Sequence, residues 1–260
     1  MPLNPRLSPY WKYLHLDFTS STMTALRDMP FPHTAGQGLL LTADYQTAGH
    51  GQRGTQWESA AGRNLLFSLR FAPCGIGARG QFALSEALAL SVVEALDGTA
   101  AGCFFVKWPN DIYWADKKIG GMLLEHTLSG GDIVTVLAGV GLNVNQERFA
   151  GAAPNPVSLF QIKGEATDRT SLLEEIMRRF DAYLCLLSHG ETARLHRRYL
   201  ERLYRREGLH SYRDAQGRFE ARITDVAPDG TLHLTDAAGR TRHYLFKEVQ
   251  FMIRANHVLP

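Results

Sequence analysis

Cysteine is scarce in this 260-residue chain, and the three cysteines form no recognisable pattern. Cys74, Cys103 and Cys185 lie far apart, their number is odd, and no Cys-x-x-Cys pair occurs. Neither a disulfide framework nor a thiolate zinc site fits this arrangement. The ten histidines include no pair at a metal-ligand spacing with an acidic residue close by, so no tightly bound protein metal is expected.

Long apolar runs are also missing. No stretch approaches the roughly 20 apolar residues that span a bilayer. The first thirty residues contain no apolar signal-peptide core and are interrupted by Pro2, Pro5 and Pro9. We therefore expect no membrane association, and the expected compartment is a reducing cytoplasm.

The chain has no strong excess of charge of either sign, since 28 Lys and Arg stand against 26 Asp and Glu. A dedicated nucleic-acid-binding protein carries a concentrated basic face, so no nucleic-acid partner is expected. The nearest candidate, Arg194 to Arg206, interleaves arginines with apolar residues at helical spacing and predicts an amphipathic helix with a solvated basic side. A hydrophobic content of 45% is ordinary for a globular protein, and the length allows one substantial domain and a small one.

The stretch from Phe104 to Glu125 is the most informative part of the chain. An apolar run, Phe104–Val106, predicts a buried strand, and Trp108–Asp111 is a turn-forming cluster. Ile112–Trp114 and Lys118–Glu125 predict two further strands joined by a tight connection. The sequence therefore predicts a β-hairpin that follows a strand and a turn.

Such a hairpin would return Lys118 toward the end of the sheet at which Lys107 and Asp111 lie. Gly120 and Gly121 leave the neighbouring strand without side chains, which is typical of a bulge or of the close approach of a ligand. Two ammonium groups, a carboxylate and bare backbone suit a phosphate. A lysine pair in a turn is also common on solvated surfaces, so this stretch alone leaves both interpretations open.

A second cluster lies upstream, where Thr42 to Ser68 reads as strand, glycine loop and strand. Gly49, Gly51 and Gly54 can adopt positive φ and point amide N–H groups at an anion. No helical pattern follows the loop, which excludes a dinucleotide fingerprint and a P-loop. A lone glycine loop is weak evidence of a site.

The remaining pattern predicts alternating strands and helices, and then a change of texture after Gly208. The expected strands are Trp11–Phe18, Leu39–Tyr45, Asn64–Phe71 and Ile133–Val144, and the expected helices are Met23–Asp28, Phe82–Leu96 and Thr170–Leu187, the last capped by Thr170 or Ser171. Four short strands separated by turns follow, at Phe219–Val226, Thr231–Thr235, His243–Phe246 and Glu248–Met252. They predict a small β-barrel.

Taken together and in order, these motifs resemble the biotin protein ligase family. The residues that carry the resemblance are Ser21-Thr22, Gln46 with GHGQRGTQW (Gly49 to Trp57), KWPND (Lys107 to Asp111), KKIGGMLLE (Lys117 to Glu125) and GVGLNVN (Gly139 to Asn145). The resemblance implies an α+β fold with a central mixed or antiparallel sheet flanked by helices, as in class II synthetases. It further implies a catalytic domain over residues 1–207 and an SH3-like barrel over residues 208–260, in a short form without an N-terminal DNA-binding domain.

The resemblance also implies an activity. Family members join biotin to AMP with ATP and Mg²⁺, and then pass the biotinyl group to a lysine of a biotin carboxyl carrier protein. A homodimer through the central sheet is common among them. Two alternatives remain open at this point, a lipoate or octanoate ligase of the same fold and a non-catalytic biotin-binding module.

Site residues follow from the matched motifs. The expected catalytic residues are Lys118, Lys107 and Arg53, and Asp111 is the candidate to organise the metal ion. The expected biotin contacts are Ser21, Thr22, Gln46, Gly49, His50, Lys118, Gly120 and Gly121, and the expected ATP contacts are Gln52, Arg53, Trp57, Lys107, Asn110, Asp111 and Asn143. Local sequence alone also allows Ser21 to be a helix cap, Trp57 a core residue and Asn143 a turn residue.

The glycine loop departs from the family pattern. Many members carry Arg-x-Arg where this chain has His50-Gly51-Gln52, so Arg53 is the positive charge that remains. An opposite charge about 4 Å away contributes about 4 kcal/mol at an effective dielectric of 20. We therefore expect this chain to retain the acyl-adenylate less well. The family also more often has Asn where this chain has Met23.

Overall fold

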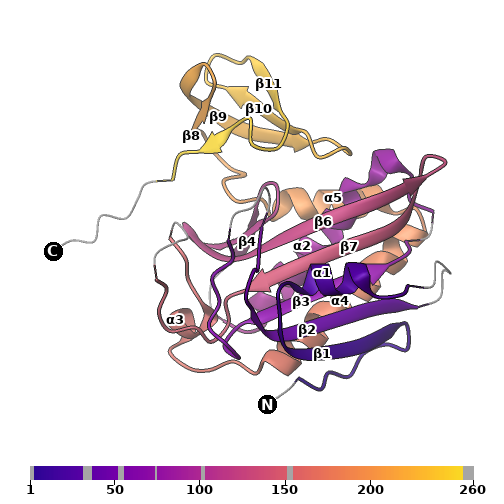
Figure 1. Ribbon diagram of the computed structural model, residues 1–260. Coiled ribbons are helices and arrows are strands. Elements are labelled where there is room, and N and C mark those ends of the chain that lie inside the picture. The colour runs from indigo at the N-terminus through magenta and orange to yellow at the C-terminus, as the bar shows by residue number, and fades with distance from the viewer. Residues whose placement is uncertain are drawn as a thin grey trace.

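A computed structural model describes residues 3–31, 37–51, 56–73, 75–100, 103–150 and 155–253. Two β-sheets and a set of helices make up the described chain (Figure 1). The helices are α1 (Thr22–Asp28), α2 (Phe82–Asp97), α3 (Leu159–Lys163), α4 (Arg169–Ser188) and α5 (Thr192–Glu201), with a 3₁₀ turn η2 (Ala78–Gly80). The strands are β1 (Trp11–Thr19), β2 (Gly38–Gln46), β3 (Leu65–Phe71), β4 (Phe104–Lys107), β5 (Asp111–Trp114), β6 (Lys117–Ser129), β7 (Asp132–Leu142), β8 (His210–Asp214), β9 (Gly217–Val226), β10 (Leu232–Asp236), β11 (Thr241–Tyr244) and β12 (Gln250–Phe251).

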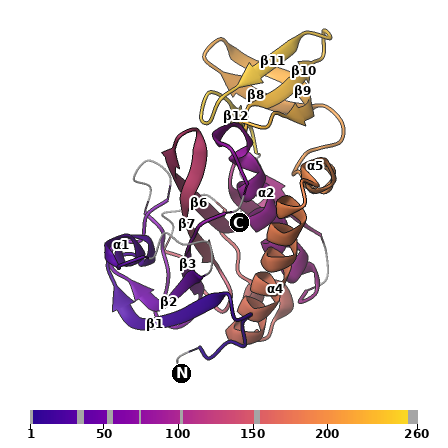
Figure 2. The same ribbon diagram turned by 90° about the vertical axis from the view of Figure 1, so that its right-hand side faces the viewer.

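The larger sheet has seven strands in the order β1-β2-β3-β7-β6-β5-β4. The β1–β2 pair is parallel and the other pairs are antiparallel, so the sheet is mixed. Figure 2 shows α1 on one side of this sheet and α2, α4 and α5 on the other. The predicted α+β class and central mixed sheet are therefore confirmed.

The two faces of the sheet are covered very differently. On the helix side, α2 is apolar almost all round because it is packed between the sheet and helices α4 and α5. On the other side the short helix α1 places Met23 and Leu26 against Leu39, Leu41 and Leu137 in a smaller apolar cluster. Toward β6 and β7, this second face carries glycines and polar groups, and the candidate site lies there.

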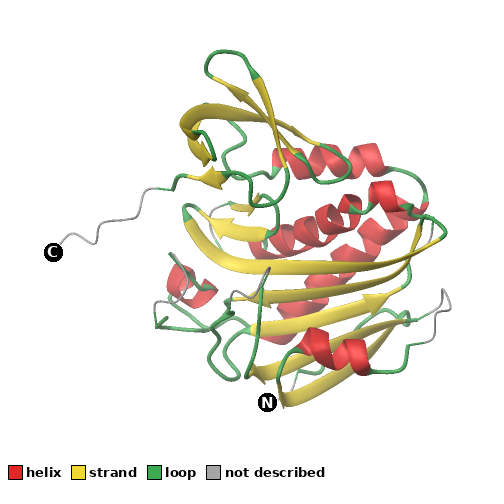
Figure 3. Cartoon of the chain, turned by 45° about the horizontal axis from the view of Figure 1, so that its top comes forward, coloured by secondary structure: helices red, strands yellow, loops and turns green. Residues whose placement is uncertain are grey.

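The smaller sheet has five antiparallel strands in the order β11-β10-β9-β8-β12 (Figure 3). It joins the larger unit at the turn after β4, where the Trp108 indole N–H donates to the Gly230 carbonyl over 2.9 Å. Phe246 packs its ring against Trp108 and Phe82. Gly230 has a φ of +91°, and a Cβ there would lie 2.8 Å from a Phe82 ring carbon, so the close approach requires glycine.

Most of the expected elements are present, and the differences that matter here concern two strands and two helix caps. Strand β8 (His210–Asp214) was not predicted, and β11 ends at Tyr244 instead of Phe246. Helix α4 is capped by Asp168, whose carboxylate accepts from the backbone of Thr170 and Ser171, so the predicted caps were wrong. Ser21 does stand at the N-cap of α1, but its side chain makes no cap hydrogen bond.

No helix of the described residues is long and apolar enough to cross a membrane. The smaller sheet begins at His210, and the domain boundary between residues 207 and 208 stays a prediction.

Candidate functional site

A bare patch of backbone forms the floor of the candidate site. A Cβ added at Gly141 would lie 2.5 Å from the Trp57 ring, and one at Gly139 would lie 2.6 Å from the Met23 sulfur. At Gly121 an added Cβ would lie 3.5 Å from a carboxylate oxygen of Asp111. Glycines on β6 and β7 thus let flat groups lie directly on the sheet, and the Trp57 indole does so at Gly141.

Two ammonium groups converge on one carboxylate beside this floor. The Lys118 Nζ lies 2.6 Å from Asp111 Oδ1, and the Lys107 Nζ lies 3.5 Å from Asp111 Oδ2. The register pairs Lys107 with Asp111 and Tyr113 with Lys118, so the hairpin returns Lys118 as predicted. A bulge between Ile112 and Tyr113 accompanies this pairing. Two cations and one anion leave an excess of positive charge that suits a phosphate.

Burial changes the chemistry of Lys107. Loss of hydration lowers the pKa of its ammonium, the Asp111 carboxylate raises it, and the charges of Lys118 and Arg205 lower it again. Burial also raises the pKa of the neighbouring Tyr113 phenol, with the charge of Asp111 acting in the same direction. The Lys118 Nζ lies 5.7 Å from the centre of the Trp57 ring, within cation–π range.

A polar cluster lies on the same face at the start of α1. The Gln46 Oε1 accepts from the Thr22 N–H over 2.7 Å and from its hydroxyl over 3.0 Å. The Thr22 hydroxyl is also 2.7 Å from that of Ser68, which is fully buried on β3. Thr22 and Gln46 were expected here, whereas Ser68 was missed. Its signal in the sequence was a lone hydroxyl in the apolar run Leu65–Phe71.

Two asparagines expected in the site have different surroundings. The Asn110 amide donates to the Met122 carbonyl and so braces the turn before β5. Asn143 is 4% exposed and donates to the Val157 carbonyl over 3.1 Å. Its side-chain oxygen is buried and has no hydrogen-bond partner among the residues that the structure describes, so one acceptor is left unused there.

Of the expected residues in the glycine loop, the structure describes Gly49 and His50. Gly49 lies against the Gln46 amide, and its carbonyl accepts from the Trp57 N–H over 2.9 Å. His50 is exposed and forms a β-bridge with Gln56 at the base of the loop. The two remaining loop residues, Gln52 and Arg53, lie outside the described residues.

Gly120 and Ser21, both expected to contact biotin, are engaged within the protein itself. Gly120 points its bare side toward Leu142 and Ile112 in the core, not toward the ammonium groups, while Gly121 faces them. Ser21 is buried beside Thr22, and its carbonyl accepts from the Ala25 N–H in the first turn of α1.

The chemistry of Asp111 bears on metal binding. Each of its oxygens faces an ammonium group, so a divalent cation bound directly would have to displace Lys107 or Lys118. Mg²⁺ commonly keeps its waters and binds through substrate phosphates instead of a cage of protein ligands. The residues present therefore do not fit direct coordination of Mg²⁺ by Asp111.

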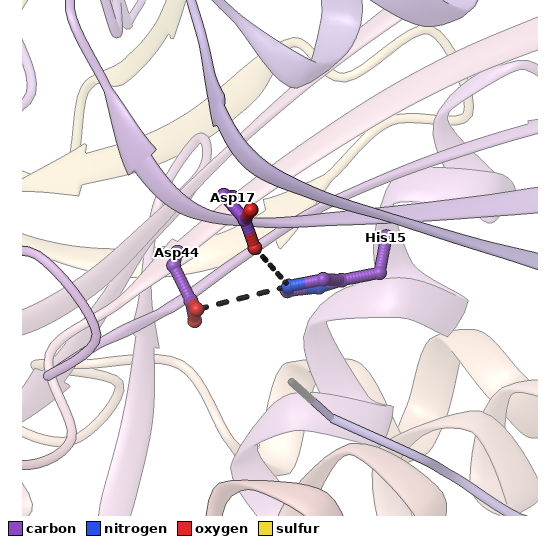
Figure 4. A group of neighbouring side chains, drawn as sticks. All are labelled: His15, Asp17 and Asp44. Atoms are coloured by element: carbon purple, nitrogen blue, oxygen red, sulfur yellow. Dashed lines mark ion pairs between the residues drawn. The ribbon is translucent and has the colours of Figure 1, made fainter. Parts of the chain in front are cut away.

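A second group of charged side chains lies on the helix side of the sheet, between β1 and β2 (Figure 4). The His15 Nε2 lies 3.8 Å from an Asp17 oxygen and 3.7 Å from an Asp44 oxygen, although the sequence indicated no such grouping. The other Asp44 oxygen is 3.2 Å from the Arg169 guanidinium, and the Asp17 side chain is 91% exposed. Asp44 is thus already paired with Arg169.

Comparisons with known proteins relate this chain to one family. A sequence profile described as the biotin/lipoate A/B protein ligase family matches residues 15–143. The biotin–[acetyl-CoA-carboxylase] ligase of Paracoccus denitrificans is 31% identical over 216 residues, which cover 80% of this chain and 88% of that protein. The bifunctional ligase/repressor BirA of Bacillus spizizenii is 32% identical over 183 residues, which cover 69% of this chain.

The lengths differ, and the fold agrees. The match covers 56% of the Bacillus spizizenii protein and 49% of its Escherichia coli counterpart, so the chain spans about half the length of these bifunctional relatives. Among solved structures, the biotin protein ligase from Aquifex aeolicus in complex with biotin and ATP superposes with a TM-score of 0.76 at 24% identity. That superposition covers 95% of this chain and 100% of the other, and it shows a shared fold.

Proposed function

The chain belongs to the biotin/lipoate A/B protein ligase family, and we propose that it is a biotin protein ligase. It forms biotinyl-5′-AMP from biotin and ATP and transfers the biotinyl group to a lysine of a biotin carboxyl carrier protein. The observation that carries this proposal is the meeting of Lys107 and Lys118 at Asp111 beside the bare floor at Gly121 and Gly141.

The polar cluster at α1 supports recognition of the ureido ring of biotin. That ring offers one carbonyl acceptor and two N–H donors, so it needs both kinds of partner. Thr22 and Ser68 supply hydroxyls, Gln46 supplies an amide, and Ser21 lies beside them. The Trp57 ring, which lies on the bare backbone at Gly141, would then form one wall for the flat fused rings. The dithiolane ring of lipoate has no N–H or carbonyl group that could exchange hydrogen bonds with this cluster, which favours biotin.

The charged cluster supports adenylation. The carboxylate of biotin attacks the α-phosphate of ATP in line, and pyrophosphate leaves. Lys118 neutralises the attacking carboxylate and the negative charge that develops on the equatorial oxygens, while Lys107 holds the α-phosphate. Asp111 holds both ammonium groups at one point before the substrates arrive. The unpaired oxygen of Asn143 suits the exocyclic amine of adenine.

Mg²⁺ enters this proposal only as a partner of the triphosphate, whose charge it would neutralise. In the second step a carrier lysine attacks the mixed anhydride and AMP leaves, so no protein nucleophile is required. A homodimer through the larger sheet and a cytoplasmic location stay predictions.

A direct test is mass spectrometry of a biotin carrier domain after incubation with this protein, ATP, Mg²⁺ and biotin. We expect one biotinyl group on one carrier lysine, and no product when biotin is replaced by lipoate. Modification by lipoate instead of biotin would identify the other branch of the family. A carrier left unmodified while biotin still binds would support a non-catalytic binding module.

A further inference from the structure

The last described strand of the smaller sheet reaches the candidate site. The Lys107 ammonium lies 5.1 Å from the centre of the Phe251 ring on β12 and 5.3 Å from that of Tyr113 on β5. Its third neighbour is Asp111, at 3.5 Å, and its side chain is only 17% exposed. Two aromatic faces and one carboxylate therefore take the place of most of its water.

Phe251 is fixed from its own sheet. It pairs with Tyr212 on β8, and the two rings meet edge to face at 5.0 Å. The backbone after it is held on both sides, because Met252 donates its N–H to the Ser211 carbonyl over 3.0 Å and accepts from the Arg205 guanidinium over 3.2 Å.

The segment between the two sheets ties Phe251 to the strand that bears Lys107. The Val106 N–H donates to the Arg202 carbonyl over 2.8 Å, and the Tyr204 N–H donates back to the Val106 carbonyl over 2.8 Å. The Tyr204 ring lies 5.2 Å from that of Tyr113 and 6.4 Å from that of Phe251. The rings of Tyr113, Tyr204 and Phe251 thus form one continuous set beside Lys107.

We infer that Phe251 is a positioning residue for adenylation: its ring face, with that of Tyr113, encloses the Lys107 ammonium and directs it toward Asp111 and the substrate phosphate. This inference rests on the proposed function. An aromatic face attracts a cation through its quadrupole, and the attraction is strongest where water is excluded. The smaller sheet therefore contributes to the site through a side chain that carries no charge and need not touch the nucleotide.

The charged surroundings of Lys107 make the contribution measurable. Burial lowers the pKa of Lys107, Asp111 opposes that change, and the charges of Lys118 and Arg205 add to it. The ring of Phe251 favours the charged form, as Asp111 does. Removal of the ring, with apolar volume kept, lowers the pKa of Lys107 further.

The variants separate the ring face from simple packing. Phe251→Leu removes the face and keeps apolar bulk, whereas Phe251→Tyr keeps both. The matched control is Phe219→Leu in the same sheet, because Phe219 also stacks on Tyr212 and has a cation, Arg242, 4.3 Å from its ring centre. It removes an equivalent pair that does not involve Lys107.

Two measurements decide the inference. The first is the reactivity of the Lys107 amine toward acetic anhydride as a function of pH, followed by mass spectrometry, which needs no catalytic activity. We expect Lys107 to become reactive at lower pH in Phe251→Leu, and to match the parent protein in Phe251→Tyr and Phe219→Leu. The second is biotin-dependent ATP–pyrophosphate exchange, in which Phe251→Leu loses about five- to tenfold in kcat/KM for ATP and the other two variants lose less than about twofold.

The outcomes distinguish this inference from the proposed function. An unchanged pH profile of Lys107 in Phe251→Leu overturns the inference, whatever the exchange rates are. Equal losses of exchange in Phe251→Leu and Phe219→Leu overturn it as well, since that result means general destabilisation of the sheet. The parent protein could also fail to catalyse biotin-dependent exchange while the pH profile of Lys107 still shifts in Phe251→Leu. That result upholds the contact and defeats only the proposed function.

Discussion

At the scale of single residues, the candidate site is a balance of charge around Asp111. One carboxylate holds Lys107 and Lys118 at 3.5 Å and 2.6 Å, respectively. Both lysines are poorly exposed, so a phosphate that enters meets cations already in position and largely stripped of water. Such preorganised charge makes the largest single contribution to transition-state stabilisation in many enzymes.

Replacement of Lys118 by Ala tests this balance. The change removes the ammonium nearest to the attacking carboxylate and leaves Asp111 paired with Lys107. We expect adenylation to slow by a few hundred-fold, equivalent to roughly 3–4 kcal/mol of transition-state stabilisation, with an unchanged melting temperature. Biotin-dependent ATP–pyrophosphate exchange measures the rate. An exchange rate equal to that of the parent protein would remove Lys118 from the catalytic role.

A second prediction concerns Gln52, which lies outside the described residues and which the motif resemblance places at the second arginine of Arg-x-Arg. Gln52→Arg adds a positive charge to the glycine loop, and we expect release of free adenylate to fall roughly tenfold, because solvent screens most of the Coulomb energy. Capture of the released adenylate by free amines measures the leak. Gln52→Met, which has similar length and no charge, is the control and should leak as the parent does. Equal leakage from Gln52→Arg and Gln52→Met would show that the missing charge is irrelevant.

The sequence predicted part of this residue-scale arrangement and not the rest. Lys118 was placed correctly because a hairpin is a local structure, and its return follows from strand lengths and a tight turn. Ser68 and Phe251 were not identified, since each reaches the site through long-range pairing that no local pattern records. The choice between Gly120 and Gly121 depends on the bulge at Ile112/Tyr113, which decides the glycine that faces the ammonium groups.

At the scale of elements, β7 forms part of the site floor with a face that carries no side chains at two positions. Gly139 and Gly141 alternate with Ala138, Val140 and Leu142, so one face of the strand is bare and the other is packed into the core. The first bare position underlies the Met23 side chain and the second underlies the Trp57 ring.

Alanine substitutions at these two glycines should have unequal effects. At Gly141 the new methyl group would meet the rigid Trp57 ring at 2.5 Å, whereas at Gly139 it would meet the flexible end of Met23 at 2.6 Å. We expect Gly141→Ala to weaken biotin binding about tenfold or more, consistent with 1–3 kcal/mol for overpacking, and Gly139→Ala to weaken it by about threefold or less. Titration calorimetry with biotin measures both. Equal losses of biotin affinity in the two variants would mean that the contact between Trp57 and Gly141 is not part of the ligand site.

The elements themselves were largely predictable, because periodicity is a strong signal in long apolar segments. Strand β8 was missed because His210–Asp214 is polar and short, and its register comes from pairing with β9 and β12. The cap of α4 was misplaced by two or three residues because Asp168, Thr170 and Ser171 are all good capping residues, and only the geometry distinguishes them.

At the scale of the whole molecule, one histidine links three elements. His196 on α5 lies 2.7 Å from Glu86 on α2 through Nδ1 and 3.1 Å from Asp225 on β9 through Nε2. The hydrogen bond to Glu86 is the main cause that raises the pKa of His196 to about 9, while burial opposes it. Burial raises the pKa of Glu86, and His196 lowers it again. A charged His196 therefore clamps the smaller sheet to the helix layer at neutral pH.

The sign of the pH effect follows from this shift. Because the folded-state pKa of His196, about 9, exceeds its unfolded value of about 6.5, the stabilisation is complete below about pH 6.5 and is lost as the pH rises through about 9. For a partly exposed group we expect about 1–2 kcal/mol after solvent screening. Urea unfolding of the parent and of His196→Gln at pH 6 and pH 9.5 measures it. The difference in unfolding free energy should be larger at pH 6, and a difference that does not depend on pH would contradict the assignment.

The connection between the two sheets also limits how other chains can approach. Along the outer edge of β4, the Phe104 N–H donates to the Asp97 carboxylate, and both the N–H and the carbonyl of Val106 are bonded to the segment that follows α5. An edge on which these donors and this acceptor are already used is a poor template for another strand. A carrier polypeptide that docks by sheet extension must therefore choose a different border of the molecule. Copies of this chain would likewise not pair through this edge.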